Sequence, residues 1–136
     1  MTPTIRNILI TLGSAVVGVF LNGWLISISG SIVAPPEGAD LTTEEGLRAA
    51  MDLMEPKHYL MPFLAHALGT LLSAALVSRF TTERQFTRAM LLGVLFLAGG
   101  ISMVRMLPSP LWFNITDLGL AYLPMAYLGY ALGRRV

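Results

Sequence analysis

Five polar side chains interrupt the long apolar stretches of this sequence, and their types suit ligand binding or proton transfer. They are Asn22, His66, Arg105, Asn114 and Asp117. An ionisable group inside a bilayer normally faces the bundle interior or a water-filled cavity, which makes it a functional candidate by default. An imidazole beside a carboxylate can act as an acid–base pair. An arginine can bind an anionic headgroup through charge-assisted hydrogen bonds.

Arg105 and Asp117 also have a purely structural interpretation. Their stretches are joined by the short turn at 108–110, so the two residues are neighbours in any fold and can form an ion pair with Asn114 beside it. Such a pair would pin a helical hairpin without any substrate, and breaking it would cost several kcal/mol. His66 alone is also explained as a hydrogen-bonded packing residue. The sequence leaves the structural and the functional interpretations open.

The elements that must position these residues are four apolar stretches, at 8–33, 59–78, 89–107 and 111–132. Each is about as long as the ~20 residues that a helix needs to cross a bilayer. Hydrophobic residues make up 54% of the chain and charged residues 12%, against roughly 25% charged in a soluble domain. We therefore expect an all-α integral membrane protein, one domain over residues 1–136, in which four transmembrane helices form a bundle. The first stretch is longer than the ~15 residues of a signal-peptide core and is expected to be a retained helix.

The charges between the stretches predict an orientation. If all four stretches cross the membrane, the N-terminus, the 79–88 loop and the C-terminus share one side, which carries six arginines and one acid. The 34–58 loop and the 108–110 turn share the other side, which has three basic residues against six acids. Positive charge concentrates in short loops on the cytoplasmic side. We therefore expect a multi-pass protein of the inner (plasma) membrane with both termini in the cytoplasm.

A short amphipathic helix is expected in the external loop, over about 42–54. Thr42 can cap this helix, with Glu45 placed three residues later as in a capping box. Apolar residues then recur with helical spacing at Leu47, Ala50, Met51 and Met54. The other face is acidic, so attraction to anionic lipid does not explain its position. We expect the helix to dock over the mouth of the bundle.

The polar side chains all fall in the external half of the predicted bundle. With a rise of ~1.5 Å per residue, Arg105 and Asn114 lie about 5 Å from the external turn, and Asp117 lies about 10 Å from it. His66 lies about 12 Å below the rim of its own stretch, and Asn22 lies past the middle of the first stretch. No comparable cluster is expected in the cytoplasmic half. A functional site is therefore expected on the external side.

Composition and spacing argue against several other kinds of site. The chain has no cysteine, which excludes disulfides, thiolate metal sites and cysteine nucleophiles. Glu55 and His58 have the E-x-x-H spacing of carboxylate-bridged metal bundles, but such sites need two copies of this motif and further carboxylates. No metal or cofactor is expected. The net charge of +1 indicates no nucleic-acid partner.

The sequence predicts a location more firmly than an activity. The leading hypothesis is a protein without enzymatic activity that binds a lipid-like or small amphiphilic ligand, or a partner protein, through an external polar pocket covered by the 42–54 helix. The expected pocket residues are His66, Arg105, Asn114, Asp117 and Asn22. One alternative is a homo-oligomeric transporter or channel with a protonatable Asp117 or His66. The other is an intramembrane enzyme in which these two residues form the acid–base pair. Membrane lipids are the expected surroundings in each case.

Overall fold

The computed structural model describes residues 2–135, and within this range all regular secondary structure is helical. The elements are α1 (Pro3–Ile32), α2 (Glu44–Ala50), the 3-10 turns η1 (Met51–Leu53) and η2 (Pro56–Tyr59), α3 (Leu60–Phe80), α4 (Gln85–Met106), α5 (Leu111–Leu120) and α6 (Leu123–Gly133). Three helical segments are long and apolar enough to cross a membrane: α1, the joined η2 and α3, and α4. The expectation of an all-helical protein is thus confirmed, and three of its helical segments could span a membrane.

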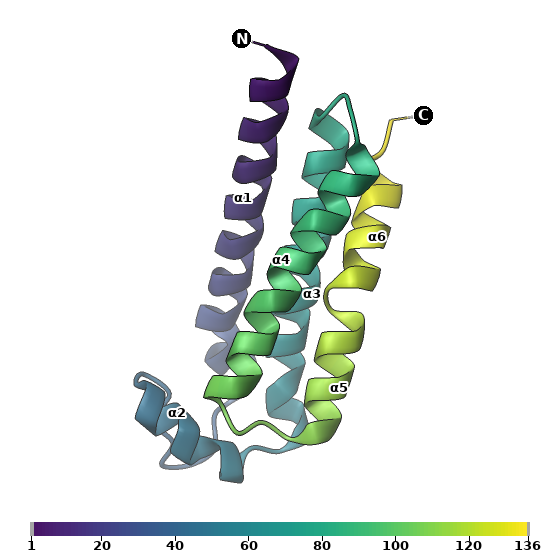
Figure 1. Cartoon of the computed structure of the whole chain (residues 1–136). Helices are drawn as coiled ribbons and strands as arrows, with labels where there is room; N and C mark the ends of the chain where they lie inside the picture. The colour runs from purple at the N-terminus through teal and green to yellow at the C-terminus, as the bar shows by residue number, and fades with distance from the viewer. Residues whose placement is uncertain (1, 136) are drawn as a thin grey trace.

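The sequence predicted one continuous helix over the fourth apolar stretch, but the structure has two. The stretch is divided into α5 and α6, which lie roughly end to end beside α3 and α4 (Figure 1). The chain leaves helical geometry at Tyr122, whose φ is −117° and ψ is −80°. Pro124 follows in the first turn of α6, where its fixed φ and missing N–H are tolerated. Proline interrupts a helix because its ring clashes with the preceding turn, which explains why the break falls here.

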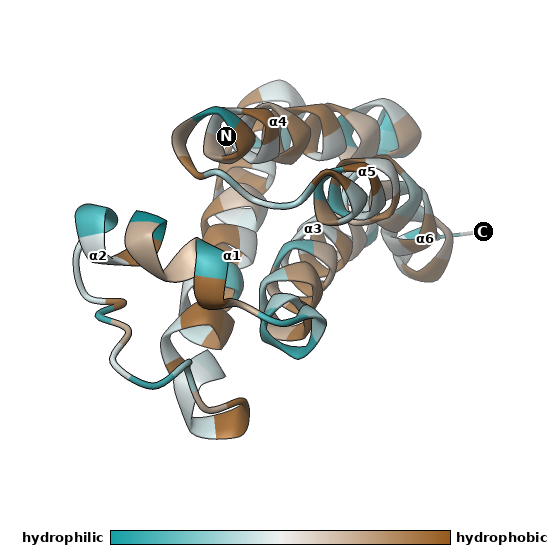
Figure 2. Cartoon of the chain, turned by 90° about the horizontal axis from the view of Figure 1, so that it is seen from below, coloured by the Kyte–Doolittle hydropathy of each residue, from teal (hydrophilic) through white to brown (hydrophobic). Residues whose placement is uncertain are grey.

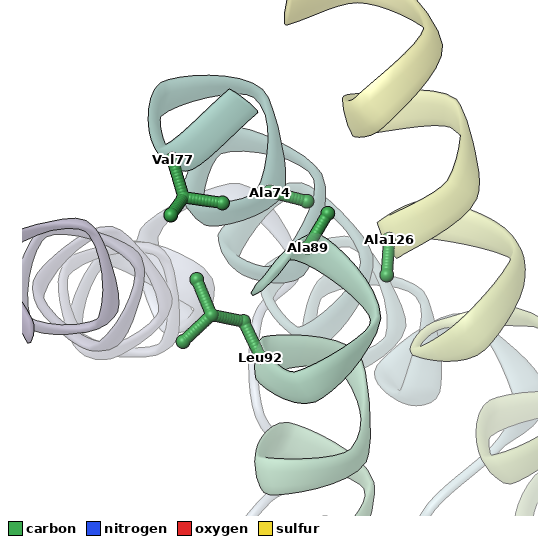
Figure 3. Close-up of a cluster of buried hydrophobic side chains, with 5 residues drawn as sticks. All are labelled: Ala74, Val77, Ala89, Leu92 and Ala126. Atoms are coloured by element: carbon green, nitrogen blue, oxygen red, sulfur yellow. The ribbon is translucent and has the colours of Figure 1, made fainter. Parts of the chain in front are cut away.

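Helix α3 lies at the centre of the packing and contacts α1, α4 and α6. A cluster of buried apolar side chains joins three of these helices, as Figure 3 shows. It consists of Ala74 and Val77 from α3, Ala89 and Leu92 from α4, and Ala126 from α6. Most of these side chains are small, so the helices approach one another closely. Apolar side chains along the outer faces of the helices stay exposed, as suits contact with lipid.

Glycines form close helix contacts on both sides of α3. A Cβ atom built on Gly18 of α1 would lie 2.6 Å from the carbonyl oxygen of Gly69 in α3. On the other side of α3, a Cβ atom on Gly129 of α6 would lie 2.7 Å from the Cβ atom of Ala74 and 2.9 Å from the backbone nitrogen of Ala75. Such small-residue rows let backbones meet inside a bilayer. They hold α1 and α6 on opposite sides of α3.

The two termini lie at one end of the molecule, and α2 lies at the other (Figure 1). Hydrophilic segments gather over α2 and its flanking loops, as Figure 2 shows from that end. The N-cap of α2 is Thr43, not the expected Thr42, and its hydroxyl accepts a hydrogen bond from Gly46 N–H at 3.0 Å. Thr42 donates instead to the Asp40 carboxylate, from its backbone N–H at 2.9 Å and from its hydroxyl at 2.6 Å. These bonds lower the pKa of Asp40.

Candidate functional site

A cavity of about 400 Å³ lies at the end of the molecule that carries α2, and we call it the α2-end cavity. Side chains from α1, α3, α4, α5 and the α2–η1 segment line it, and most of them are apolar. Its apolar wall includes Ile26, Met51, Met61, Met103, Val104 and Phe113. Its volume falls within the ~300–1,000 Å³ of small-molecule pockets. Methionines adapt their shape to irregular ligands, so the wall suits a flexible apolar chain.

Four of the five polar residues singled out in the sequence line this cavity. Asn22 comes from α1, His66 from α3, and Asn114 and Asp117 from α5. They meet because each helix turns one face toward the cavity at a similar level. The three helices thus bring together residues that are far apart in the sequence.

Asp117 is the centre of the polar cluster. Its carboxylate is 3% exposed and accepts two hydrogen bonds. Oδ1 lies 2.8 Å from Nδ1 of His66, and Oδ2 accepts from the Tyr122 hydroxyl at 3.0 Å. The rings of His66 and Tyr122 stack with centroids 5.8 Å apart. In a neutral imidazole, donation from Nδ1 to the carboxylate leaves a lone pair on Nε2.

Tyr122 is a site residue that the sequence did not reveal. It sits at the break between α5 and α6, and the turn of the chain there lets its hydroxyl reach back to Asp117. Its ring fits because α4 has a glycine opposite it: a Cβ atom on Gly100 would lie 2.6 Å from Cζ of Tyr122. The pairing of a glycine with an aromatic ring across two helices leaves no periodic signal that sequence inspection can detect.

The expected ion pair between Arg105 and Asp117 is not formed within residues 2–135, which corrects that interpretation of the sequence. Arg105 is exposed in the last turn of α4 and does not line the cavity. The cavity-lining stripe of α4 runs through Gly100, Met103, Val104 and Leu107, with the i, i+3, i+4, i+7 spacing of one helix face. Arg105 falls outside that stripe. His66 and Tyr122 provide the hydrogen bonds that Arg105 was expected to make.

The α2–η1 segment covers the cavity with the apolar face that its periodicity predicts. Leu47, Met51 and Met54 line the cavity, and Ala50 is buried. The helix itself is shorter than expected and ends at Ala50, where the 3-10 turn η1 continues it. This segment therefore covers one side of the cavity, and we call it the lid segment.

His58 links the loop that follows α1 to the turn that precedes α3. Its Nδ1 accepts from the backbone N–H of Glu55 at 2.8 Å, and its Nε2 lies 3.0 Å from the carbonyl oxygen of Ala34, just after α1. Both ring nitrogens are therefore engaged within the chain. The Glu55 carboxylate pairs with Lys57 at 3.0 Å, and this contact lowers the pKa of Glu55. The E-x-x-H spacing of Glu55 and His58 is thus explained by the hydrogen-bonded turn that these residues form.

A second polar cluster lies at the opposite end, contrary to the sequence analysis, which expected none there. Asn7 of α1 is fully buried, and its side-chain amide meets the N–H of Thr82 at 3.4 Å and the hydroxyl of Thr82 at 3.5 Å. Arg88 donates from Nη1 to the Asn7 carbonyl oxygen at 3.4 Å and to the Thr11 hydroxyl at 3.0 Å. Arg6 donates to the Thr82 hydroxyl at 3.2 Å. We call these residues the Asn7 cluster.

The signal for Asn7 was present in the sequence. Asn7, Thr11, Ser14 and Gly18 follow helical spacing and extend the small-residue row of α1 toward the N-terminus. Comparison with known proteins adds no further indication, because no protein-family model, curated protein or solved structure matches this chain.

Proposed function

We propose that this protein binds a small amphiphilic ligand in the α2-end cavity. The supporting observation is that an apolar cavity has His66, Asp117 and Asn22 together on its wall. An apolar pocket with a few convergent polar groups is the usual form of a small-molecule site. The ligand's tail would lie among the methionines, and its polar group would meet His66. The lid segment would enclose the tail.

We further propose that the protein crosses the plasma membrane four times, with α5 and α6 together forming the fourth crossing. Residues 111–133 would extend about 34 Å as helix, against ~30 Å for the hydrocarbon core. The arginine-rich segments at the termini and at 79–88 support a cytoplasmic location for both termini. The lid and the cavity would then face the outside.

The orientation can be tested directly because the chain has no cysteine. Single cysteines at Glu37 and Glu83 would be treated with a membrane-impermeant maleimide in intact cells. We expect Glu37→Cys to react and Glu83→Cys to react only after the cells are opened. The reverse pattern would overturn the orientation, and reaction of both in intact cells would overturn four crossings.

The binding proposal can be tested with photoreactive amphiphiles. We would use three decyl compounds that carry a diazirine in the tail and end in a hydroxyl, a carboxylate or a trimethylammonium group. The protein would be held in phosphatidylcholine nanodiscs, and labelled residues would be mapped by mass spectrometry. We expect at least one compound to label the cavity wall and to be chased by its unlabelled form, because specific binding saturates.

A cavity-filling variant supplies the matched control. Val104→Trp fills the cavity and should reduce saturable labelling at least about tenfold, because the tail loses its space. Val94→Trp places the same side chain on an exposed part of the same helix and should leave labelling unchanged. Equal effects of the two variants, or labelling that never saturates, would contradict the proposal.

The hydrogen bond between His66 and Asp117 favours a second candidate function, acid–base catalysis on the bound ligand. A buried carboxylate that holds Nδ1–H leaves Nε2 to accept a proton. In ester hydrolysis, Nε2 would take a proton from water as the water oxygen attacks the carbonyl carbon, and would return it to the leaving oxygen. A decanoate ester tests this: cleavage that is lost in His66→Gln, while the variant stays folded in nanodiscs, would support it. No cleavage above that of empty nanodiscs would contradict it.

A further inference from the structure

Most polar groups around the α2-end cavity are already paired within the chain. Both oxygens of Asp117 and both ring nitrogens of His58 have partners. The Ser29 hydroxyl donates to the carbonyl oxygen of Ile26 at 2.7 Å. The Tyr59 hydroxyl donates to a methionine sulfur at 3.6 Å. The hydroxyl protons of Ser29 and Tyr59 are therefore not available to a ligand without breaking a bond.

Two more polar residues on the cavity wall bond to each other in the turn between α4 and α5. The Ser109 hydroxyl donates to Oδ1 of Asn114 at 2.6 Å. Nδ2 of Asn114 donates in return to the carbonyl oxygen of Ser109 at 3.3 Å. Asn114 therefore closes the turn, although the sequence suggested it as a ligand contact. Its position on the cavity wall does not by itself make it a binding group.

Two side-chain groups on the wall have no hydrogen-bond partner within residues 2–135: Nε2 of His66 and the side-chain amide of Asn22. They belong to neighbouring levels of the bundle, because a Cβ atom on Gly69, three residues after His66, would lie 3.2 Å from the Cβ atom of Asn22. Nε2 of a neutral imidazole offers an acceptor, and the amide offers donors and an acceptor. A group that both donates and accepts would satisfy them together.

The charged residues on the cavity wall further restrict which polar group the ligand can carry. Asp117 is the one carboxylate among the lining residues, and no arginine or lysine lines the cavity. An anionic headgroup would therefore enter without a positive partner, close to a buried negative charge, at a large desolvation cost. A quaternary ammonium group cannot donate a hydrogen bond to Nε2. A hydroxyl can donate to Nε2, accept from the Asn22 amide, and carry no charge.

We propose that the polar group of the ligand is a neutral hydroxyl, held between Nε2 of His66 and the side-chain amide of Asn22. This inference rests on the proposed binding function and specifies the ligand class as an amphiphilic alcohol. It also replaces the anionic headgroup that Arg105 suggested in the sequence. The hydroxyl proton would lie on the path from ligand to Nε2, and Asp117 would hold the imidazole in the required tautomer.

The three photoreactive decyl compounds test the headgroup because their tails are identical. We expect the alcohol to label the cavity at least about tenfold more tightly than the carboxylate, which corresponds to about one net hydrogen bond. We expect the trimethylammonium compound to label no better than the carboxylate. Affinities would be read from the concentration of unlabelled compound that halves the labelling in the unmodified protein.

Asn22→Leu isolates the contribution of the amide. The substitution keeps the size of the side chain and breaks no hydrogen bond within the described residues, so the fold should persist. It should weaken binding of the alcohol about tenfold and leave the carboxylate compound unchanged. The matched control is Ser29→Ala, which removes a polar wall group that is already bonded to Ile26 and should change neither compound.

The outcomes distinguish failure of the hydroxyl inference from failure of the binding proposal. Preference for the alcohol that is lost in Asn22→Leu supports the hydroxyl ligand. Preference for the carboxylate or the ammonium compound overturns the hydroxyl inference but leaves binding in the cavity intact. An alcohol preference that survives in Asn22→Leu also overturns the proposed contact. Absence of saturable labelling by all three compounds overturns both proposals.

Discussion

The two ends of this bundle use buried polar groups in opposite ways. In the Asn7 cluster, amide, hydroxyl and guanidinium groups bond to one another and to the backbone, and they join α1 to the α3–α4 loop and to α4. At the α2-end cavity, Asp117 gathers His66 and Tyr122 beside an open space. Burial is similar at both ends, since Asn7 is 0% exposed and Asp117 is 3% exposed.

The difference lies in what remains after the internal bonds are made. The side-chain amide of Asn7 has its donor and its acceptor engaged by Thr82. His66 is held through one ring nitrogen and keeps the other. A polar residue inside a membrane bundle is therefore a site candidate only when some of its hydrogen-bonding capacity is left beside a cavity. Burial and polarity alone do not distinguish a structural cluster from a binding site.

The largest effect should come from removing the centre of the cavity cluster. Asp117→Leu leaves the donors of His66 and Tyr122 without their acceptor, which should lower the free energy of unfolding by about 3 kcal/mol. Unfolding in mixed micelles at increasing SDS measures this. Combining Asp117→Leu with His66→Leu and Tyr122→Phe removes the stranded donors and should recover part of the loss. A triple variant less stable than the single one would show that these contacts are not the cause.

A smaller loss of stability is expected at the other end. Asn7→Leu removes two long hydrogen bonds to Thr82, so the free energy of unfolding should fall by about 1 kcal/mol. Photolabelling of the cavity should not change, because the Asn7 cluster shares no residue with the cavity wall. Reduced labelling in Asn7→Leu would mean that the two ends of the molecule are energetically coupled and that the Asn7 cluster is not purely structural.

Acid should loosen the start of the lid without unfolding the bundle. The pKa of Asp40 is lowered in the folded chain by its bonds to Thr42, so these contacts are present at neutral pH and are lost as the pH falls below the ordinary value of 3.8. Amide exchange at Thr42, corrected for intrinsic rates, should lose protection on acidification. Asp40→Asn, which does not titrate, should give a flat profile. A parallel loss in both proteins would assign the change to another group.

The smallest effect is expected at Arg105. This side chain is exposed and outside the cavity, so Arg105→Ala should change the free energy of unfolding by less than about 0.5 kcal/mol. Saturable labelling by the alcohol compound should also be unchanged. Under the ion-pair interpretation of the sequence, the same variant would be strongly destabilised. Under the anionic-headgroup interpretation, it would lose its ligand, so this single substitution separates all three accounts.

The hydropathy of the chain and the spacing of its apolar residues predicted much of the fold, because both are properties of the local sequence. Three helices that could span a membrane follow from the length of the apolar stretches, and the apolar face of the lid follows from the i, i+3, i+4, i+7 spacing. The break at Tyr122 could not be predicted from Pro124 alone, because the extent of a distortion at proline depends on how neighbouring helices pack against it. The shift of the cap from Thr42 to Thr43 came from competition with Asp40 for the hydroxyl.

The sequence predicted where the site lies but not which residues form hydrogen bonds within it. Depth along each helix placed Asn22, His66 and Asp117 at one level, which the cavity brings together. The partner of Asp117 depended on which faces of the helices meet, and proximity along the chain favoured the wrong one. Helical phase relative to Gly100 would have placed Arg105 on another face. No local feature of the sequence indicated Tyr122.

The glycine contact between α6 and α3 has a consequence for mutational tolerance. Gly129 and Gly133 face the backbone of α3 so closely that even an alanine collides: a Cβ atom on Gly133 would lie 2.8 Å from the carbonyl carbon of Ala75. In a saturation-mutagenesis library scored for folded protein in the membrane, these two positions should be among the least tolerant in the chain. Asn22 should accept many residues in the same screen. Positions away from the proposed chemistry would then rank beside Asp117, so a map of intolerance to substitution would not by itself locate the binding site.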